Sequence, residues 1–264
     1  MDRSLIVTTV PKPSDSEILH AENLAKELQA DYVKRTSTVR KMQETHGVRK
    51  VLVAGERLTL HAGDQKLFFH PSMAVVRVKR MLLGDTDVIV EKSGLARGDS
   101  VLDCTLGMGA DAIVFSHAVG KEGVVIGIEY NPILVILVRE GLKTWRSGVP
   151  EVDEAMRRVQ VVTGSHLGYM RNLPDRSIDV VYFDPMFRET VKESINFDPI
   201  RILSVTDELS VEAIGEAKRI ARKSVVLKER MYSGEFQRLG FPQPYQRSSS
   251  FTYSVISIQG EESP

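Results

Sequence analysis

Residues 101–112 read Val-Leu-Asp-Cys-Thr-Leu-Gly-Met-Gly-Ala-Asp-Ala. An apolar run ends on Asp103 and breaks into a loop with Gly107 and Gly109, after which an apolar helical pattern begins. Glycine lets a backbone turn sharply and approach a ligand closely. A strand, a glycine loop and a helix in this order are typical of the nucleotide or cofactor crevice of α/β proteins. Twenty residues after Gly109, a second apolar run ends on Glu129, where an acid accepts hydrogen bonds from a ribose.

Two cofactor classes share this layout. Read as Gly107-x-Gly109-x-x-Ala112, the loop satisfies the relaxed dinucleotide fingerprint. A pyrophosphate needs backbone N–H groups and little negative charge, whereas Asp103 and Asp111 flank these glycines. S-adenosylmethionine carries a sulfonium and an ammonium, which acids attract. The stretch therefore favours S-adenosylmethionine, with a dinucleotide-dependent oxidoreductase or a glycine turn without a ligand as the alternatives.

Composition restricts the class of protein. The 264 residues, 42% hydrophobic and 27% charged, predict a soluble chain of one large domain or of one domain with a smaller appendage. No apolar run approaches the roughly 18 residues of a membrane span, so we expect no membrane contact. The single cysteine, Cys104, excludes an internal disulfide and agrees with a reducing cytoplasm. The six histidines show no paired spacing with Cys or acids, so no metal site is predicted.

Charge is unevenly distributed along a chain whose net charge is zero. Residues 1–97 carry 16 Lys and Arg against 12 Asp and Glu, a net charge of +4, and the remainder carries −4. Most of the excess lies in the basic segment 34–50, which contains Lys34, Arg35, Arg40, Lys41, Arg49 and Lys50. Such a segment can follow a phosphate backbone and predicts RNA as a partner. The alternative is that these residues form the solvated face of a helix and bind no RNA.

The remaining pattern predicts two regions. Residues 5–10 read as a strand, and a capping box at Ser14 and Glu17 predicts a helix that runs to about Lys34. Residues 50–70 predict an antiparallel meander. Helices are expected at 73–83, 85–92, 110–119, 132–146 and 206–221, and strands at 100–103, 124–129, 158–163, 178–183 and 224–229. This alternation predicts a parallel sheet covered on both faces, and residues 251–258 predict an antiparallel strand at its edge.

The fourth strand of this sheet leads into a second motif, Asp184-Pro185-Met186-Phe187. Because ligands lie beyond the carboxyl ends of parallel strands, Asp184 and the glycine loop should share one crevice. The Asp184 carboxylate and the Pro185 carbonyl can accept the hydrogens of an exocyclic amine, while Phe187 stacks on the base. Holding the amine in line with the methyl carbon of a donor then supplies much of the rate acceleration of methyl transfer. A strand-ending turn with a core Phe is the alternative.

These motifs resemble those of class I S-adenosylmethionine-dependent methyltransferases. More closely, the chain resembles the bacterial RsmJ-type family, which methylates the N2 amine of a guanine in small-subunit ribosomal RNA. The resemblance covers about residues 99–230 and rests on Asp103-x-Thr105-x-Gly107-x-Gly109-x-Asp111-Ala112, Glu129-x-Asn131-Pro132 and Asp184-Pro185-Met186-Phe187. It implies a Rossmann-like, mostly parallel seven-stranded sheet with an antiparallel C-terminal edge.

The resemblance also implies a set of site residues. It places cofactor contacts at Ala110, Asp111, Glu129, Tyr130, Ser165, His166 and Asp184, beside the loop residues Asp103, Gly107 and Gly109. Glu129 would hold the ribose hydroxyls and Ser165 would lie near the adenine, while a loop histidine without a ligand is the alternative for His166. The catalytic residues would be Asp184, Pro185 and Phe187. The chain departs from the family at Ala110, where a basic residue is common, at the less basic segment 188–190 and across 71–97.

These observations predict an N-terminal α+β subdomain at residues 1–72 and a Rossmann-like methyltransferase domain at 73–264. The expected activity is methyl transfer from S-adenosylmethionine to a guanine N2 amine of small-subunit ribosomal RNA, in the cytoplasm. The alternatives are a methyltransferase that acts on a small molecule or a protein, the oxidoreductase, and an RNA-binding module without catalysis.

Overall fold

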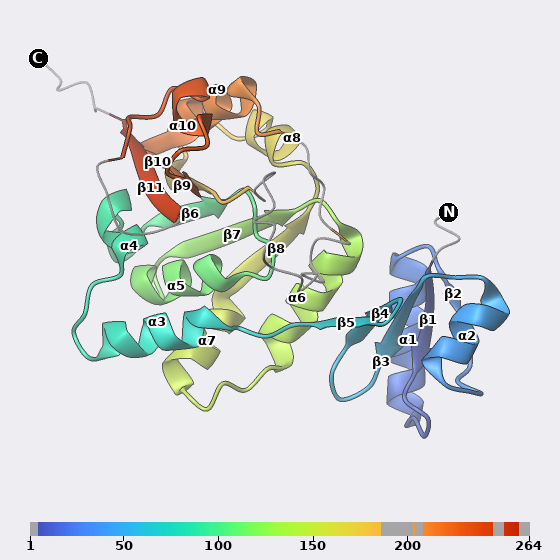
Figure 1. Cartoon of the computed structure of the whole chain (residues 1–264). Helices are drawn as coiled ribbons and strands as arrows, with labels where there is room; N and C mark the ends of the chain where they lie inside the picture. The colour runs from blue at the N-terminus through green and yellow to red at the C-terminus, as the bar shows by residue number, and fades with distance from the viewer. Residues whose placement is uncertain (1–4, 186–202, 204–207, 245–250, 259–264) are drawn as a thin grey trace, which may run out of the picture.

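The computed structural model describes residues 5–185, 203, 208–244 and 251–258. Within these residues the chain forms two sheets, one from residues 5–68 and a larger one from residues 100–257 (Figure 1). The predicted α/β class with a Rossmann-like region is confirmed.

The first sheet has the strand order β2-β1-β3-β4-β5. Strands β2, β1 and β3 are parallel, and β3, β4 and β5 form the antiparallel meander that the sequence predicts. The strands are β1 (Leu5–Thr9), β2 (Asp31–Tyr32), β3 (Lys50–Ala54), β4 (Thr59–Ala62) and β5 (Gln65–Phe68). Helices α1 (Asp15–Glu27) and α2 (Val39–His46) connect the parallel strands.

Helix α1 begins as its sequence predicts and ends earlier than expected. Ser14 and Glu17 form the capping box, with the Ser14 hydroxyl accepting from the Glu17 N–H at 3.3 Å. The prediction that the helix continues to Lys34 is wrong, because Gln29 takes a left-handed backbone with φ +52° and the chain then enters β2. Strand β2 pairs with β1 at only two positions, and a strand this short leaves no recognisable pattern in the sequence.

The larger sheet has the strand order β11-β10-β9-β6-β7-β8. All neighbours are parallel except β10 and β11, which are antiparallel as predicted for the C-terminal edge. The strands are β6 (Ser100–Asp103), β7 (Val124–Glu129), β8 (Val159–Thr163), β9 (Ile178–Phe183), β10 (Ala221–Arg230) and β11 (Phe251–Ser257). The expected count of seven strands is corrected to six for the described part of the chain, because β11 alone pairs with the outer edge of β10 there.

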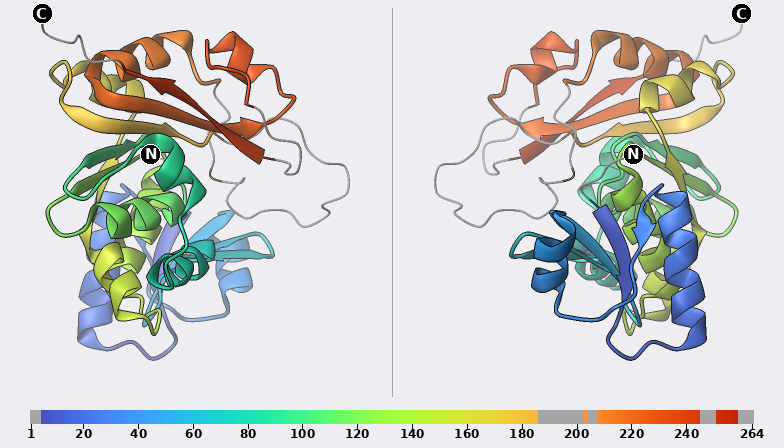
Figure 2. Two further views of the ribbon diagram at one scale, coloured as in Figure 1. Left: turned by 90° about the vertical axis from the view of Figure 1, so that its left-hand side faces the viewer. Right: turned by 90° about the vertical axis from the view of Figure 1, so that its right-hand side faces the viewer.

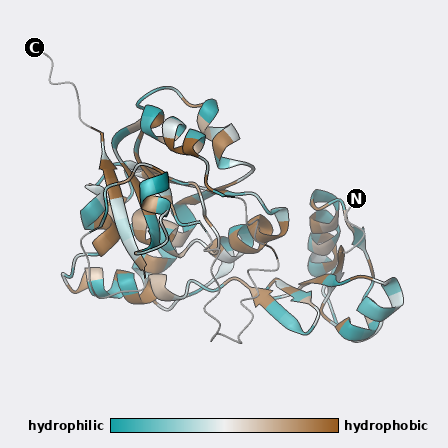
Figure 3. Cartoon of the chain, turned by 45° about the horizontal axis from the view of Figure 1, so that its top comes forward, coloured by the Kyte–Doolittle hydropathy of each residue, from teal (hydrophilic) through white to brown (hydrophobic). Residues whose placement is uncertain are grey.

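Helices cover both faces of this sheet. One hydrophobic cluster packs helices α3, α5, α6 and α7 against one face, and a second packs α8, α9 and α10 against the other. The helices are α3 (Met73–Leu82), α4 (Val88–Ser93), α5 (Ala110–Val119), α6 (Pro132–Thr144), α7 (Pro150–Arg158), α8 (His166–Arg171), α9 (Val211–Ile220) and α10 (Glu235–Arg238). Hydrophobic residues follow the strands and the inner helix faces, and hydrophilic residues the outer turns (Figure 3).

Three of these helices were not predicted. Helix α7 carries a local signal, since Pro150 stands at its first turn with acids after it and two arginines close its last turn. Helices α8 and α10 have six and four residues, which is too short for a helical period to be recognised.

Helix α1 beside the small sheet lies next to α6 (Figure 2). Arg139 on α6 donates to both carboxylate oxygens of Glu27 on α1, at 2.8 and 2.7 Å. Phe69, which follows β5, packs against Gly141 of α6 so closely that a Cβ there would lie 2.0 Å from its ring. These contacts fix the small sheet against the larger one.

No helix in the described ranges is both long and apolar enough to cross a membrane.

Candidate functional site

The carboxyl ends of three parallel strands, β6, β7 and β9, lie at one edge of the larger sheet. Strand β6 ends at Asp103, β7 at Glu129, and β9 leads directly into Asp184. The Thr105 hydroxyl accepts a hydrogen bond from the Asp184 N–H at 2.6 Å. The structure therefore brings the glycine loop and Asp184, the first residue of the second motif, together, as the parallel arrangement predicts.

The glycine loop is folded tightly against β7. Gly107 and Gly109 have φ values of +50° and +75°, a left-handed backbone that glycine adopts without a steric penalty. The Leu106 N–H donates to the Ile128 carbonyl at 3.0 Å. A Cβ on Gly127 would lie 2.4 Å from the Leu106 side chain, so β7 needs a glycine at this point to let the loop approach. Gly109 then caps α5, whose first residue is Ala110.

Asp103 is buried beneath this loop, with 1% of its surface exposed. One of its carboxylate oxygens accepts from the Thr105 N–H at 3.0 Å. Burial raises the pKa of Asp103 well above its ordinary value, and the nearby Asp111 and Asp184 carboxylates raise it further. Asp103 therefore shapes the loop from within.

Asp111, in the first turn of α5, anchors a network of charged side chains. Its carboxylate accepts from the Tyr182 hydroxyl at 2.8 Å and from the Arg77 guanidinium. Arg77, on α3, also donates to both oxygens of Asp87 at 2.8 Å. Burial favours the neutral form of Asp111, but Lys228, Arg77 and the Tyr182 hydroxyl outweigh it and lower the pKa of Asp111.

Lys228 of β10 connects this network to Asp184. Its Nζ lies 2.5 Å from Asp184 Oδ2 and 3.5 Å from Asp111 Oδ2. Burial raises the pKa of Asp184 to about 6, with Asp111 adding to the rise and Lys228 opposing it. Burial would lower the pKa of Lys228, but the two carboxylates overcome it and raise that pKa. Lys228 is therefore a fixed positive charge beside Asp184.

The sequence prediction missed Arg77 and Lys228. Lys228 carried a weak signal, as the first charged residue after the apolar run that ends the fifth strand. Arg77 carried none, because it stands 34 residues before Asp111, in the segment where the resemblance to the RsmJ-type family is weakest.

Glu129 lies at the end of β7 next to the glycine loop. Its Oε1 accepts from the Asn131 N–H at 2.9 Å. Burial raises the pKa of Glu129, while hydrogen bonds from the backbones of Asn131, Gly107 and Tyr130 oppose the rise. The Tyr130 side chain is 63% exposed. Glu129 is therefore held by the backbones of the loop and of its own turn.

Ser165 and His166 follow β8, where Ser165 caps α8 and His166 is its first residue. The Ser165 hydroxyl caps α8 by accepting from the Gly168 N–H at 3.5 Å. The His166 ring meets the Phe183 ring edge-on, with 5.8 Å between centroids, and burial lowers the pKa of His166. His166 is therefore a partly buried ring that packs edge-on against Phe183.

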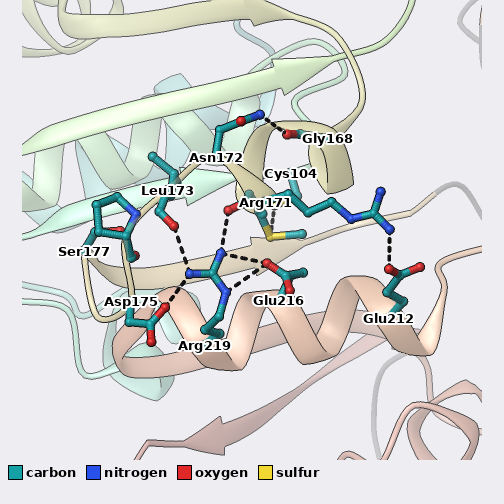
Figure 4. A network of polar contacts seen from close by, with 12 residues as sticks. Cys104, Gly168, Arg171, Asn172, Leu173, Asp175, Ser177, Glu212, Glu216 and Arg219 are labelled. Atoms are coloured by element: carbon teal, nitrogen blue, oxygen red, sulfur yellow. Dashed lines mark hydrogen bonds and ion pairs between the residues drawn. The ribbon is translucent and has the colours of Figure 1, made fainter.

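Arg219 of α9 fixes α8 in place (Figure 4). Its guanidinium donates to the Met170 and Leu173 carbonyls, both at 2.9 Å, and to Asp175 at 2.6 Å. Arg171 at the end of α8 forms an ion pair with Glu212. This network keeps Ser165 and His166 at the edge of the sheet.

Pro185 directly follows Asp184 and is half-buried. Phe187, the third expected catalytic residue, lies outside the described residues. In the part of the chain that the structure describes, no group of three or more His, Cys, Asp or Glu side chains could hold a metal ion.

The residues at this edge fit a cationic cofactor. Even with Asp103 protonated, the three carboxylates of Asp87, Asp111 and Asp184 exceed the two cations of Arg77 and Lys228. Net negative charge beside a glycine loop attracts a sulfonium or an ammonium and repels a pyrophosphate. The fold and the site thus define a class I S-adenosylmethionine-dependent methyltransferase.

Comparison with known proteins identifies the family. The family described as "Putative SAM-dependent methyltransferase" matches residues 34–239. The chain is 43% identical over 253 residues to YpiP of Bacillus subtilis (strain 168), covering 95% of this chain and 98% of YpiP. The chain belongs to this family of S-adenosylmethionine-dependent methyltransferases, and S-adenosylmethionine is its cofactor. The dinucleotide alternative is therefore wrong.

More distant relatives include ribosomal RNA small subunit methyltransferases J. That of Buchnera aphidicola subsp. Schizaphis graminum is 30% identical over 137 residues, 51% of this chain and 53% of the relative. That of Shewanella amazonensis is 32% identical over 169 residues, 61% of this chain and 66% of the relative. This chain thus matches about half to two thirds of their length.

A solved structure shares this fold. The S-adenosylmethionine-dependent methyltransferase NGO1261 from Neisseria gonorrhoeae superposes with a TM-score of 0.64 at 16% identity, covering 97% of each chain.

Proposed function

We propose that this methyltransferase acts on the exocyclic N2 amine of a guanine in small-subunit ribosomal RNA. The observation that carries the proposal is Asp184, an ionisable carboxylate beside the glycine loop, held by Thr105 and Lys228. The partial matches to ribosomal RNA small subunit methyltransferases J support the choice of acceptor.

The cofactor side of the site comprises the glycine loop and the end of β7. Glu129 would accept hydrogen bonds from the ribose hydroxyls, and the exposed Tyr130 beside it and Ser165 would border the adenine. Gly107 and Gly109 let the backbone approach, while Ala110 begins the helix. Asp111 contributes charge through its network with Arg77 and Lys228, and His166, the residue after Ser165, would lie on the adenine side.

The acceptor side comprises Asp184, Pro185 and Phe187. S-adenosylmethionine supplies a methyl group on a sulfonium. The Asp184 carboxylate and the Pro185 carbonyl accept the two amine hydrogens, which turns the nitrogen lone pair towards the methyl carbon, and Phe187 stacks on the base. When bound, S-adenosylmethionine would supply the methyl carbon to this nitrogen, and the electrons of the broken C–S bond would remain on sulfur. The nitrogen then loses a proton to Asp184, whose pKa of about 6 lets it pass the proton to water.

RNA binding is assigned to the basic segment 34–50 of the N-terminal region. Lys34, Arg40, Lys41 and Arg49 are exposed on and around α2. Arg35 is half-buried and donates to the Ser37 carbonyl at 2.5 Å and the Thr9 carbonyl at 3.4 Å, so it fixes the loop before α2 instead. Flipping a paired guanine into the crevice would cost a few kcal/mol, which such phosphate contacts offset.

The proposal includes the division into a subdomain at residues 1–72 and a methyltransferase domain at 73–264. The two separate sheets support it. It also includes a cytoplasmic location, which agrees with the buried thiol of Cys104.

The test is transfer of labelled methyl from S-adenosylmethionine to small ribosomal subunits and to deproteinised ribosomal RNA, followed by nucleoside digestion. The RNA comes from a strain that lacks this gene, so the site is open. Label in N2-methylguanosine supports the proposal, and label in another nucleoside shows that the acceptor is wrong. If S-adenosylmethionine binds but no RNA is labelled, the methyltransferase class stands and the search moves to other acceptors, a small molecule or a protein among them.

Asp184→Ala is the matched variant for this assay. We expect transfer to fall by about 10²-fold to 10³-fold, the usual effect of losing one preorganised polar group at a reacting centre. Binding of S-adenosylmethionine and the melting temperature report whether the site remains folded, and Asp184→Asn, which keeps the side-chain shape, repeats the test. Wild-type turnover in a folded variant would remove Asp184 from the mechanism.

A further inference from the structure

We infer that the face of the β10–β11 ribbon that carries Lys228 also holds a nucleotide next to the target base. In this inference the Phe251 ring stacks on that unpaired base and the Arg230 guanidinium contacts its phosphate. The ligand class is thus single-stranded nucleic acid, and the inference rests on the proposed function.

The strand register places the relevant side chains on one face. Lys228 pairs with Tyr253, and Arg230 pairs with Phe251. Side chains two residues apart on a strand point to the same face. Because Lys228 contacts Asp184, this is the face that borders the reacting centre. Arg230 and Phe251 therefore form an outer pair beside the inner pair of Lys228 and Tyr253.

The outer pair extends past the neighbouring strand. Strand β9 ends at Phe183, which pairs with Leu227, so residues 228–230 of β10 continue with β11 alone. The inner Tyr253 is half-buried, and burial raises the pKa of its hydroxyl. Phe251 is 39% exposed. The face thus passes from a buried charged pair at Asp184 to an exposed aromatic ring.

The chemistry of the outer pair suits a nucleotide. The Arg230 guanidinium carbon lies 5.9 Å from the centroid of the Phe251 ring, so an aromatic face and a planar cation adjoin. Aromatic rings stack on any unpaired base, and a guanidinium matches the geometry of a phosphate. Two residues of a strand span about 6.8 Å, so the outer pair reaches a neighbour of the target base.

The test compares Phe251→Leu with Phe251→Trp. Leu removes the ring and keeps apolar volume, whereas Trp keeps a stacking surface. The control is Phe68→Leu, because Phe68 on β5 of the other sheet also lies under an arginine, with the Arg57 guanidinium carbon 3.8 Å from its ring centroid. For each variant we would measure the Kd for a fluorescent single-stranded RNA oligonucleotide, the Kd for S-adenosylmethionine, and the KM for RNA in methyl transfer.

Phe251→Leu should weaken oligonucleotide binding by about 5-fold to 150-fold, the range for loss of one stacked base. Phe251→Trp should restore it, and Phe68→Leu and the cofactor Kd should stay at wild-type values. Arg230→Gln should reduce the slope of log Kd against log salt by about 0.7, as expected for one lost phosphate contact on a single strand.

The outcomes separate this inference from the proposed function. Equal Kd values for wild type and Phe251→Leu would overturn the inference while methylation of RNA still stood. An equal loss in Phe68→Leu would also overturn it, since the effect would not belong to this face. If the wild type methylates no RNA but Phe251→Leu weakens oligonucleotide binding, the proposed acceptor fails and the stacking surface stands.

Discussion

Replacing Lys228 by Met should move the pH dependence of methyl transfer. The Lys228 ammonium lies 2.5 Å from Asp184 Oδ2, and the pKa of Asp184 is about 6 with that charge in place. A neighbouring opposite charge lowers a carboxyl pKa by about 1 to 3 units. Removing it should therefore raise the pKa of Asp184 to about 7 to 9.

The sign and size of the effect follow from the ionised fraction of Asp184. Only the ionised form of Asp184 can take the proton that the nitrogen loses, so activity should rise with pH through the pKa of Asp184. At pH 7 a pKa of 6 leaves about nine tenths of the group ionised, and a pKa of 8 about one tenth. Lys228→Met should thus lose about tenfold in kcat/KM at pH 7 and recover most of it near pH 9.

Stability should change in the same pH range. In the folded protein the pKa of Asp184 is raised above its ordinary value of 3.8. Its contribution to folding is therefore fully present below about pH 4 and is lost as pH rises through about 6. In Lys228→Met this loss should extend to higher pH. The free energy of unfolding at pH 5 and at pH 8, measured with urea, checks the direction.

Lys223→Met is the matched control. Lys223 stands near the opposite end of the same strand, with its Nζ 2.6 Å from Asp99 Oδ2. This variant removes a lysine–aspartate pair from β10 and should leave the pH profile unchanged. Lys228→Arg keeps the charge and should retain the wild-type midpoint. Carboxyl ¹³C NMR titration of Asp184 gives a readout independent of the acceptor. A midpoint in Lys228→Met equal to that of the wild type would refute the reasoning.

Two further predictions concern the cofactor and the contact between the sheets. Glu129→Gln should weaken S-adenosylmethionine binding by about 1–3 kcal/mol without changing the melting temperature, since hydrogen bonds to a charged group are lost; an unchanged Kd in calorimetry would place the ribose elsewhere. Gly141→Ala should destabilise the protein by about 1–3 kcal/mol, because the new Cβ would lie 2.0 Å from Cγ and 2.2 Å from Cβ of Phe69. Gly215→Ala is its control, since that site on α9 has open space and the change should stabilise the protein by about 0.5–1 kcal/mol. Equal unfolding midpoints for the two variants in denaturant would contradict the close packing at α6.

The local pattern determined the central elements of the fold. The apolar runs before Asp103 and Glu129 and the glycines between them predicted β6, the loop, α5 and β7, because strand period and glycine conformation are local properties. Parallel strands end at one edge of a sheet, so the sequence also predicted that Asp103, Glu129 and Asp184 lie together. The antiparallel C-terminal strand followed from its alternation.

Only the tertiary structure decided which charges surround Asp184. Arg77 reaches Asp111 from a helix 34 residues earlier, and Lys228 reaches Asp184 across 44 residues. No local period encodes such pairs, because they depend on how α3 packs over α5 and on the register of β10 against β9. The same holds for Phe251 beside Arg230, whose shared face exists only once β11 has paired with β10. The sequence thus determined the backbone that holds the cofactor, and packing determined the charges and rings around it, because electrostatic and stacking contacts act through space and not along the chain.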